Sequence, residues 1–253
     1  MGVFAAGGVL LALFLLVERR AAEPVLPSWV VSRRLLGTTA LVSFGVGAVL
    51  IGLTSFVPTF LEGALSSSPL VAGLALAALT VGWPISASQA GRLYLRIGFK
   101  ATALIGVSVT VAGLLVLALT AAVPNVASVA GSCFVVGLGL GLVATPTLIA
   151  AQSSVPWNER GVVTSTNMFA RSIGSALGVA VFGAVANAIY AGTPGGDSSG
   201  PAVVAASGAV FLAALVAGLV TVAAVLAMPA VHPGTSGGKG PDQVLADAED
   251  STQ

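Results

Sequence analysis

Residues 91–123 read GRLYLRIGFKATALIGVSVTVAGLLVLALTAAV, in which a ten-residue segment with three cations precedes an apolar run. The run, 101–123, is longer than the roughly 20 residues that a helix needs to cross about 30 Å of hydrocarbon. Five further apolar runs of similar character occur along the chain. The sequence therefore predicts six transmembrane helices, at 35–61, 70–90, 101–123, 126–151, 162–190 and 201–227.

The cations are distributed unevenly between the connections of these helices. Nine of the ten Lys and Arg residues lie before the first helix or in every second connection after it: Arg19, Arg20, Arg33, Arg34, Arg92, Arg96, Lys100, Arg160 and Lys239. Short loops rich in Lys and Arg remain in the cytoplasm. We therefore expect a multi-pass protein of the cell (plasma or inner) membrane with a cytoplasmic C-terminus.

The composition excludes several other classes of protein. The chain is 56% hydrophobic and 8% charged, with a mean hydropathy of +1.02, which leaves too little polar surface for a soluble domain. A membrane β-barrel would show short segments of alternating polarity, whereas these runs are apolar on all sides. The net charge of +1 offers no basic patch for nucleic acid. The sequence thus predicts an all-α integral membrane protein that binds the lipid bilayer.

The two ends of the chain differ from the six predicted helices. Residues 1–17 are apolar but would form a helix of only about 24 Å, so we expect the inner end of a preceding transmembrane helix there. Residues 18–34 are predicted to be a short cytoplasmic linker, with an interfacial piece around Trp29. Residues 228–253 contain Pro, Gly and four acidic residues, which predicts a disordered cytoplasmic tail.

The segment between the second and third predicted helices carries a recognisable motif. Its residues Gly91, Leu93, Arg96, Gly98 and Lys100 match a Gly-x-Leu-x-Asp-Arg-x-Gly-Arg-Lys pattern. This spacing resembles the cytoplasmic loop motif in one half of a major facilitator superfamily transporter. Leu95 stands where the family has Asp, and Phe99 replaces a basic residue. The resemblance therefore implies a degenerate copy that positions the loop, as in a C-terminal half.

Other segments resemble the fourteen-span drug:proton antiporter-2 group of this superfamily. They are Phe60-Leu61-Glu62-Gly63, Ser68-Pro69-Leu70-Val71-Ala72-Gly73-Leu74, Gly137-Leu138-Gly139-Leu140-Gly141 with Pro146, Arg160-Gly161, and Arg171-Ser172-Ile173-Gly174-Ser175-Ala176-Leu177-Gly178. The resemblance implies that 35–227 form the six-helix C-terminal bundle of a major facilitator fold.

The resemblance also implies a function and its partners. The chain would be the C-terminal half of a secondary active transporter that exports drugs, or amphipathic or cationic small molecules, by proton antiport and alternating access, as in multidrug resistance. It would need the N-terminal half of the same transporter, a small-molecule substrate and protons. None of the predicted spans holds an Asp or Glu, apart from Glu62 at an outer end. The coupling acid is therefore expected in the N-terminal half.

The fifth predicted helix is the most polar. Thr164, Asn167, Arg171 and Ser175 fall within an arc of about 80° at 100° per residue. An Arg inside a span costs roughly 2.5–3.5 kcal/mol on insertion scales and is rarely left without a partner. We expect Arg171 either to extend to the cytoplasmic surface or tie down a neighbouring helix, or to gate the cavity and attract an anionic group.

Further residues are candidates for the cavity or for helix packing. The family places its first, fourth and fifth helices of each half nearest the cavity, and its third and sixth at the periphery. Candidate cavity or gating residues are Thr54, Phe60, Thr145, Asn167, Arg171 and Ser175. Candidate packing residues are Gly137, Gly141, Gly174 and Gly178, because small residues let membrane helices approach closely.

The sequence also bears on other classes of function. No His occurs within the spans, and clustered His, Cys or carboxylates are absent there, so neither a catalytic residue nor a metal or cofactor site is predicted. The single Cys133 excludes an internal disulfide. Two alternatives stay open: a major facilitator transporter of another metabolite, and a non-transporting membrane scaffold.

Overall fold

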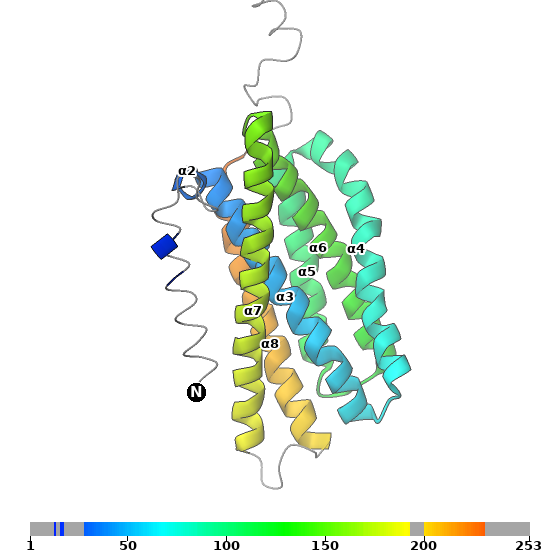
Figure 1. Cartoon of the computed structure of the whole chain (residues 1–253). Coiled ribbons are helices and arrows are strands. Elements are labelled where there is room, and N and C mark those ends of the chain that lie inside the picture. Colours follow the sequence, from blue (N-terminus) through cyan, green and yellow to red (C-terminus); the bar gives the residue numbers. More distant parts are fainter. Residues whose placement is uncertain (1–12, 14–15, 18–27, 193–199, 231–253) are drawn as a thin grey trace, which may run out of the picture.

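The computed structural model describes residues 13, 16–17, 28–192 and 200–230. It contains a short helix, α2 (Ser28–Ser32), and six long ones: α3 (Arg34–Leu65), α4 (Pro69–Ile97), α5 (Phe99–Thr120), α6 (Val126–Ser153), α7 (Arg160–Ala191) and α8 (Gly200–Ala227) (Figure 1). A 3-10 turn, η1 (Trp157–Glu159), precedes α7. The predictions for 1–17 and for the tail lie almost entirely outside the described residues.

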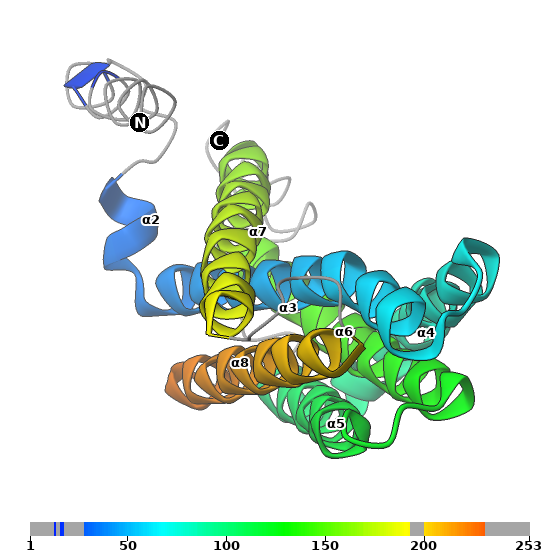
Figure 2. The same ribbon diagram turned by 90° about the horizontal axis from the view of Figure 1, so that it is seen from below.

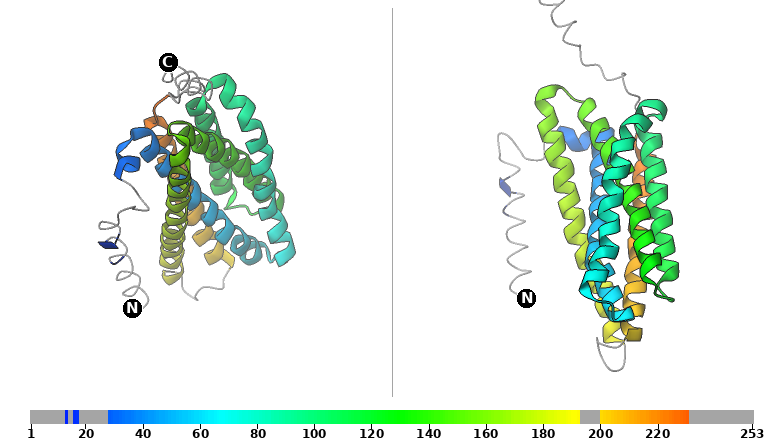
Figure 3. Two further views of the ribbon diagram at one scale, coloured as in Figure 1. Left: turned by 45° about the horizontal axis from the view of Figure 1, so that its top comes forward. Right: turned by 90° about the vertical axis from the view of Figure 1, so that its right-hand side faces the viewer.

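All six long helices are long and apolar enough to cross a membrane. This confirms the prediction of an all-α membrane protein. The helices run up and down in one bundle (Figure 3), with the start of α3 and the start of α7 at the same end. That end carries Arg33, Arg34, Arg92, Arg96, Lys100 and Arg160, and we call it the basic end.

Local sequence determines several helix ends. The Ser68 side chain accepts a hydrogen bond from the Val71 N–H at 3.4 Å and Pro69 occupies the first turn, which together start α4. The Asn125 side chain accepts from the Ala127 N–H at 2.8 Å and starts α6. At the end of α3, Ser66 adopts a left-handed conformation with φ 51°.

Residues 91–100, which were predicted to connect the second and third helices, are themselves almost entirely helical. Gly91 and Leu93 lie within α4, and a single residue, Gly98, separates α4 from α5. Its φ of 88° and ψ of 163° belong to a region that is essentially restricted to glycine. The two helices therefore turn about Gly98 alone, while the Tyr94 and Phe99 rings stack across the break at 4.7 Å.

We predict that Gly98→Ala lowers the free energy of unfolding by about 1–3 kcal/mol, because a Cβ is strained in this backbone conformation. Unfolding of the purified chain in mixed micelles, followed by circular dichroism, would measure the change. Gly91→Ala is the matched control: it lies in helical backbone beside open space, so it should leave stability unchanged or raise it by up to about 1 kcal/mol. Equal stability of both variants would contradict the prediction.

Two cations of the basic end bind the end of α8. Lys100 Nζ donates to the Leu226 carbonyl at 2.7 Å, and Arg34 Nε donates to the Ala227 carbonyl at 3.2 Å. The last carbonyls of a helix lack partners within it and carry partial negative charge, so cations there are favourable. In this structure Lys100 thus ties the start of α5 to the end of α8, whereas Leu95 is 65% exposed.

The helices pack in pairs around α3. α4 lies along α6, α7 lies along α3, and α5 fits between α6 and α8. Viewed from below, α7 and α8 flank α3, and α4 lies far from α7 (Figure 2). At the basic end, α2 packs through the buried Val30 against Val155 and Val163, beside the turn between α6 and α7. The bundle therefore leaves one side of α4 and one side of α7 without a neighbour.

Candidate functional site

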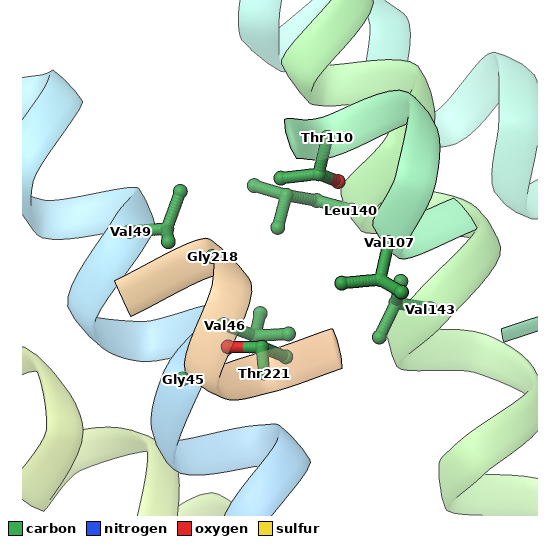
Figure 4. A pocket seen from close by; sticks show the side chains of 9 residues that line it. All are labelled: Gly45, Val46, Val49, Val107, Thr110, Leu140, Val143, Gly218 and Thr221. Carbon is green, nitrogen blue, oxygen red and sulfur yellow. The ribbon is translucent and has the colours of Figure 1, made fainter. Parts of the chain in front are cut away.

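The interior of the six-helix bundle is filled with side chains. The central cavity has a volume of about 10 Å³, where α3, α5, α6 and α8 meet (Figure 4). Its two hydroxyl groups, on Thr110 and Thr221, already donate to Gly106 and Ala217 carbonyls at 3.0 and 2.8 Å. A space of this size holds at most one water molecule. A ligand of drug size therefore cannot bind in this cavity.

α4 and α7 are the least apolar of the six membrane-spanning helices. Their mean hydropathies are 1.8 and 1.7, against 2.1–2.7 for the other four helices. They are also the least buried, at 28% and 22% of their apolar windows, against 39–56%. If the least buried helices faced lipid, they should be the most apolar of the six rather than the least apolar. These two helices therefore have the character of protein-covered or cavity-lining helices.

Arg171 and Trp83 contact one another across this surface. The Arg171 Cζ lies 5.7 Å from the centre of the Trp83 ring, within the range of a cation–π interaction. Trp83 is the central residue of α4, 14 residues from either end. Arg171 lies 11 residues, or roughly 17 Å, from the start of α7. The contact thus lies near mid-depth and joins two helices that otherwise do not pack against each other.

The Arg171 side chain thus turns toward α4 rather than toward the surface of the basic end, the first of the places expected for it. Gly47 of α3 explains the direction. A Cβ at Gly47 would overlap the Arg171 carbonyl and press against its Cγ. Because glycine leaves this space open, the Arg171 Cγ passes beside Gly47 and its guanidinium group reaches the ring of Trp83. Its Nε is buried without a hydrogen-bond partner.

The remaining polar residues of α7 bind neighbouring helices. Asn167 is buried, and its Oδ1 accepts from Ser43 Oγ of α3 at 2.8 Å while its Nδ2 donates to the Val163 carbonyl at 3.0 Å. Ser175 Oγ donates to the Gly47 carbonyl at 3.1 Å. Thr164 Oγ1 accepts from Gln152 Nε2 of α6 at 2.7 Å. This polar stripe therefore joins α7 to α3 and α6, with Arg171 as the member that reaches further.

The other candidate cavity residues lie in different surroundings. Thr54 is partly buried and its hydroxyl donates to the Ile51 carbonyl of its own helix at 3.1 Å, and Thr145 is partly buried on α6. Phe60 is fully buried and meets Phe211 of α8 edge to face at 5.3 Å. Phe60 therefore has no surface to offer a ligand, which corrects its assignment as a cavity residue.

Four glycines lie at the close approaches between paired helices. A Cβ at Gly174 would overlap the Phe44 carbonyl of α3, and one at Gly178 would come within 2.9 Å of the Ala48 Cα. A Cβ at Gly137 would overlap the Leu79 carbonyl of α4, and one at Gly141 the Trp83 carbonyl. The Gly141 contact places α6 directly behind Trp83, so the ring is held on a rigid pair of helices.

A hollow of about 400 Å³ lies at the basic end, between α6 and α7. It is lined by Gln152, Trp157, Arg160, Gly161 and Thr164. The Arg160 guanidinium stacks 5.1 Å from the exposed Trp157 ring. An aromatic and cationic rim of this kind is typical of the membrane interface. The hollow is lined by Thr164, the first residue of the polar stripe of α7.

Trp83 was missed by reasoning from the sequence. A signal was present, since tryptophan is enriched at membrane interfaces and is unusual at the centre of a span. Its neighbours Gly82 and Pro84 also interrupt a regular apolar helix. Among the described residues, no group of three or more His, Cys, Asp or Glu is arranged to hold a metal ion. Cys133 is buried and unpaired.

Comparison with known proteins identifies the family. Residues 1–179 match the family model described as Major Facilitator Superfamily. The chain is 31% identical to the multidrug transporter protein MdtP of Bacillus subtilis over 188 residues, which are 74% of this chain and 35% of that protein. It is 30% identical to the tetracycline resistance determinant of Streptomyces rimosus, covering 76% of this chain and 56% of that protein.

A third relative is the puromycin resistance protein pur8 of Streptomyces alboniger, at 29% identity over 78% of this chain and 40% of that protein. The chain therefore spans from about a third to just over half of the length of these relatives. The family match covers more than half of the chain and agrees with its six apolar helices. The protein therefore belongs to the major facilitator superfamily.

Proposed function

We propose that this chain is the C-terminal half of a fourteen-span secondary active transporter that exports drugs across the cell membrane by proton antiport. The printed names of its relatives, which include multidrug, tetracycline and puromycin resistance proteins, support drug export. The share of those proteins that the chain covers supports its assignment as one half. Alternating access requires two halves that rock around a site near mid-membrane.

The observation that carries this proposal is the exposed surface of α4 and α7. These helices are the least apolar and the least buried of the six, and Arg171 meets Trp83 between them near mid-depth. An N-terminal half placed against this surface would cover it and would enclose a cavity with Arg171 and Trp83 in its wall. The cavity where α3, α5, α6 and α8 meet supports the same placement, because its volume of about 10 Å³ is too small for a drug.

Orientation and coupling follow from the charges. We place the basic end and the C-terminus in the cytoplasm, since loops rich in Lys and Arg remain inside. The six long helices contain a single carboxylate, Glu62. It is exposed and lies near the end of α3 away from the basic end. The proton is therefore carried by an acid of the N-terminal half. The Lys100 contact with the end of α8 supports a positioning role for the motif, in which Leu95 stands where the family has Asp.

A non-transporting scaffold is the second candidate, and a metabolite in place of a drug is the third. A scaffold would not need an arginine in mid-span, which costs roughly 2.5–3.5 kcal/mol on insertion scales. The position of Arg171 therefore favours transport over anchoring. The choice between a drug and a metabolite rests on the names of the relatives.

Co-expression tests the proposal. The chain would be produced with an N-terminal half, such as that of MdtP, in cells that lack their own drug exporters, and efflux of a preloaded fluorescent drug would be followed. We expect efflux that stops when a protonophore collapses the proton gradient, and none from either half alone. Absence of efflux from two halves that co-purify as a stable complex would contradict transport and favour the scaffold.

A further inference from the structure

Arg171 has no counter-ion near it within the described part of the chain. The carboxylates associated with the six long helices are Glu62, near the end of α3 away from the basic end, and Glu159, one residue before α7. Glu159 precedes Arg171 by 12 residues, or roughly 18 Å along the helix. At this separation an ion pair cannot form. The middle of the exposed surface therefore carries one uncompensated positive charge.

The contact between Arg171 and the Trp83 ring is a cation–π interaction, which does not itself use the N–H donors of the guanidinium group. A guanidinium group that stacks on an aromatic ring still has its five N–H donors in its own plane, pointing away from the ring. The Nε donor is buried and lacks an acceptor. The two terminal nitrogens form the fork that binds a carboxylate with two parallel hydrogen bonds. The Trp83 ring, partly exposed, adds an aromatic surface beside this fork.

We propose that the Arg171–Trp83 pair is a binding site for an amphipathic organic anion, meaning a carboxylate or sulfonate attached to an aromatic or hydrophobic frame. This inference rests on the proposed function and names the substrate class of the same surface. The anionic group binds the Arg171 fork, and the frame lies along Trp83 and Met168, which is one helical turn from Arg171 and 59% exposed.

Electrostatics sets the selectivity of such a site. Two like unit charges at about 4 Å repel by about 4 kcal/mol at an effective dielectric constant of 20. A cationic drug cannot approach the Trp83 ring closely while Arg171 occupies it, whereas an anion gains the same attraction. The pair thus prefers anions over cations of the same shape. The family resemblance implied drugs, or amphipathic or cationic small molecules, and this preference favours amphipathic anions among them.

The preference can be measured by binding, without transport. The chain has three tryptophans, so Trp29→Phe with Trp157→Phe leaves Trp83 as the fluorescent reporter. The purified chain in zwitterionic nanodiscs would be titrated with pyrenebutyrate and with the matched cation pyrenebutyl-trimethylammonium, both of which accept energy from tryptophan. We expect saturable quenching of Trp83 by the anion, with an affinity at least about tenfold higher than for the cation.

Variants separate specific binding from partitioning into the lipid. Arg171→Gln should remove the preference for the anion, and Arg171→Lys should keep part of it, because lysine retains the charge but not the fork. Arg92→Gln, which removes an exposed cation of the basic end, should leave it unchanged. Equal affinities for the two probes, or an Arg171→Gln variant that still prefers the anion, would overturn the proposal.

In the last part of the experiment, the N-terminal half is added to the nanodiscs. If the N-terminal half abolishes anion binding when it is added to the nanodiscs, its own carboxylate is the counter-ion of Arg171, and the anion site is refuted. If anion binding persists but the co-expressed halves show no efflux, the proposed transport fails while this inference stands. Efflux of cationic drugs together with no anion preference would support the proposed transport and overturn this inference.

Discussion

Gly174→Leu is expected to lower the free energy of unfolding by about 3 kcal/mol or more, or to prevent a stable bundle from forming. A Cβ at this position would overlap the backbone carbonyl of Phe44, and backbone cannot move aside as a flexible side chain can. Overpacking in a filled interior typically costs 1–3 kcal/mol. Here α3 and α7 must also separate, which breaks the Ser43–Asn167 and Ser175–Gly47 hydrogen bonds.

The matched control lies on the same helix. Gly183→Leu adds the same side chain to α7, but a Cβ there meets no atom within 4 Å, so stability should stay unchanged or rise slightly with helix propensity. Thermal unfolding of both variants in detergent, followed by size-exclusion chromatography of fluorescent fusions, would compare them. A Gly174→Leu variant that is as stable as Gly183→Leu would show that α3 and α7 do not pack as described.

The helices were predictable because membrane spans have a simple physical requirement. A helix that crosses the hydrocarbon needs about 20 apolar residues, and runs such as 101–123 satisfy it unambiguously. The helix ends were less predictable, since hydrocarbon thickness does not stop a helix. α4 continues to Ile97, seven residues beyond the predicted end at 90, because nothing before Gly98 breaks it. Polarity thus locates a span, whereas backbone conformation determines where its helix ends.

The candidate site was only partly predictable from the sequence. Arg171 could be selected because a charge inside a span is costly. The direction of the Arg171 side chain could not be predicted, because it depends on the space that Gly47 leaves on another helix. Phe60 was misassigned for a related reason: the face it presents follows from the crossing of α3 and α8, which brings it to Phe211. Sequence periodicity describes one helix at a time, whereas these contacts depend on pairs.

Arg171→Gln in the co-expressed transporter is expected to reduce drug efflux by up to about thirtyfold at unchanged expression. The contact with Trp83 is the interaction that joins α4 to α7 across the surface, and cation–π pairs contribute about 0.5–2 kcal/mol. Losing 2 kcal/mol changes the ratio of two conformations by about thirtyfold. Because this contact holds α4 and α7 in the conformation that the structure shows, its loss depopulates that conformation.

Arg171→Lys and Trp83→Phe distinguish gating from simple charge. Lysine keeps the positive charge and phenylalanine keeps an aromatic face, so each should retain part of the cation–π interaction and show efflux between the wild-type and Arg171→Gln values. Trp83→Leu, which keeps the apolar surface but removes the ring, should match Arg171→Gln. Initial rates of efflux at several drug concentrations would measure these effects. Wild-type rates in both Arg171→Gln and Arg171→Lys would rule out a gating role, because neither the charge nor its contact with the ring would then matter for transport.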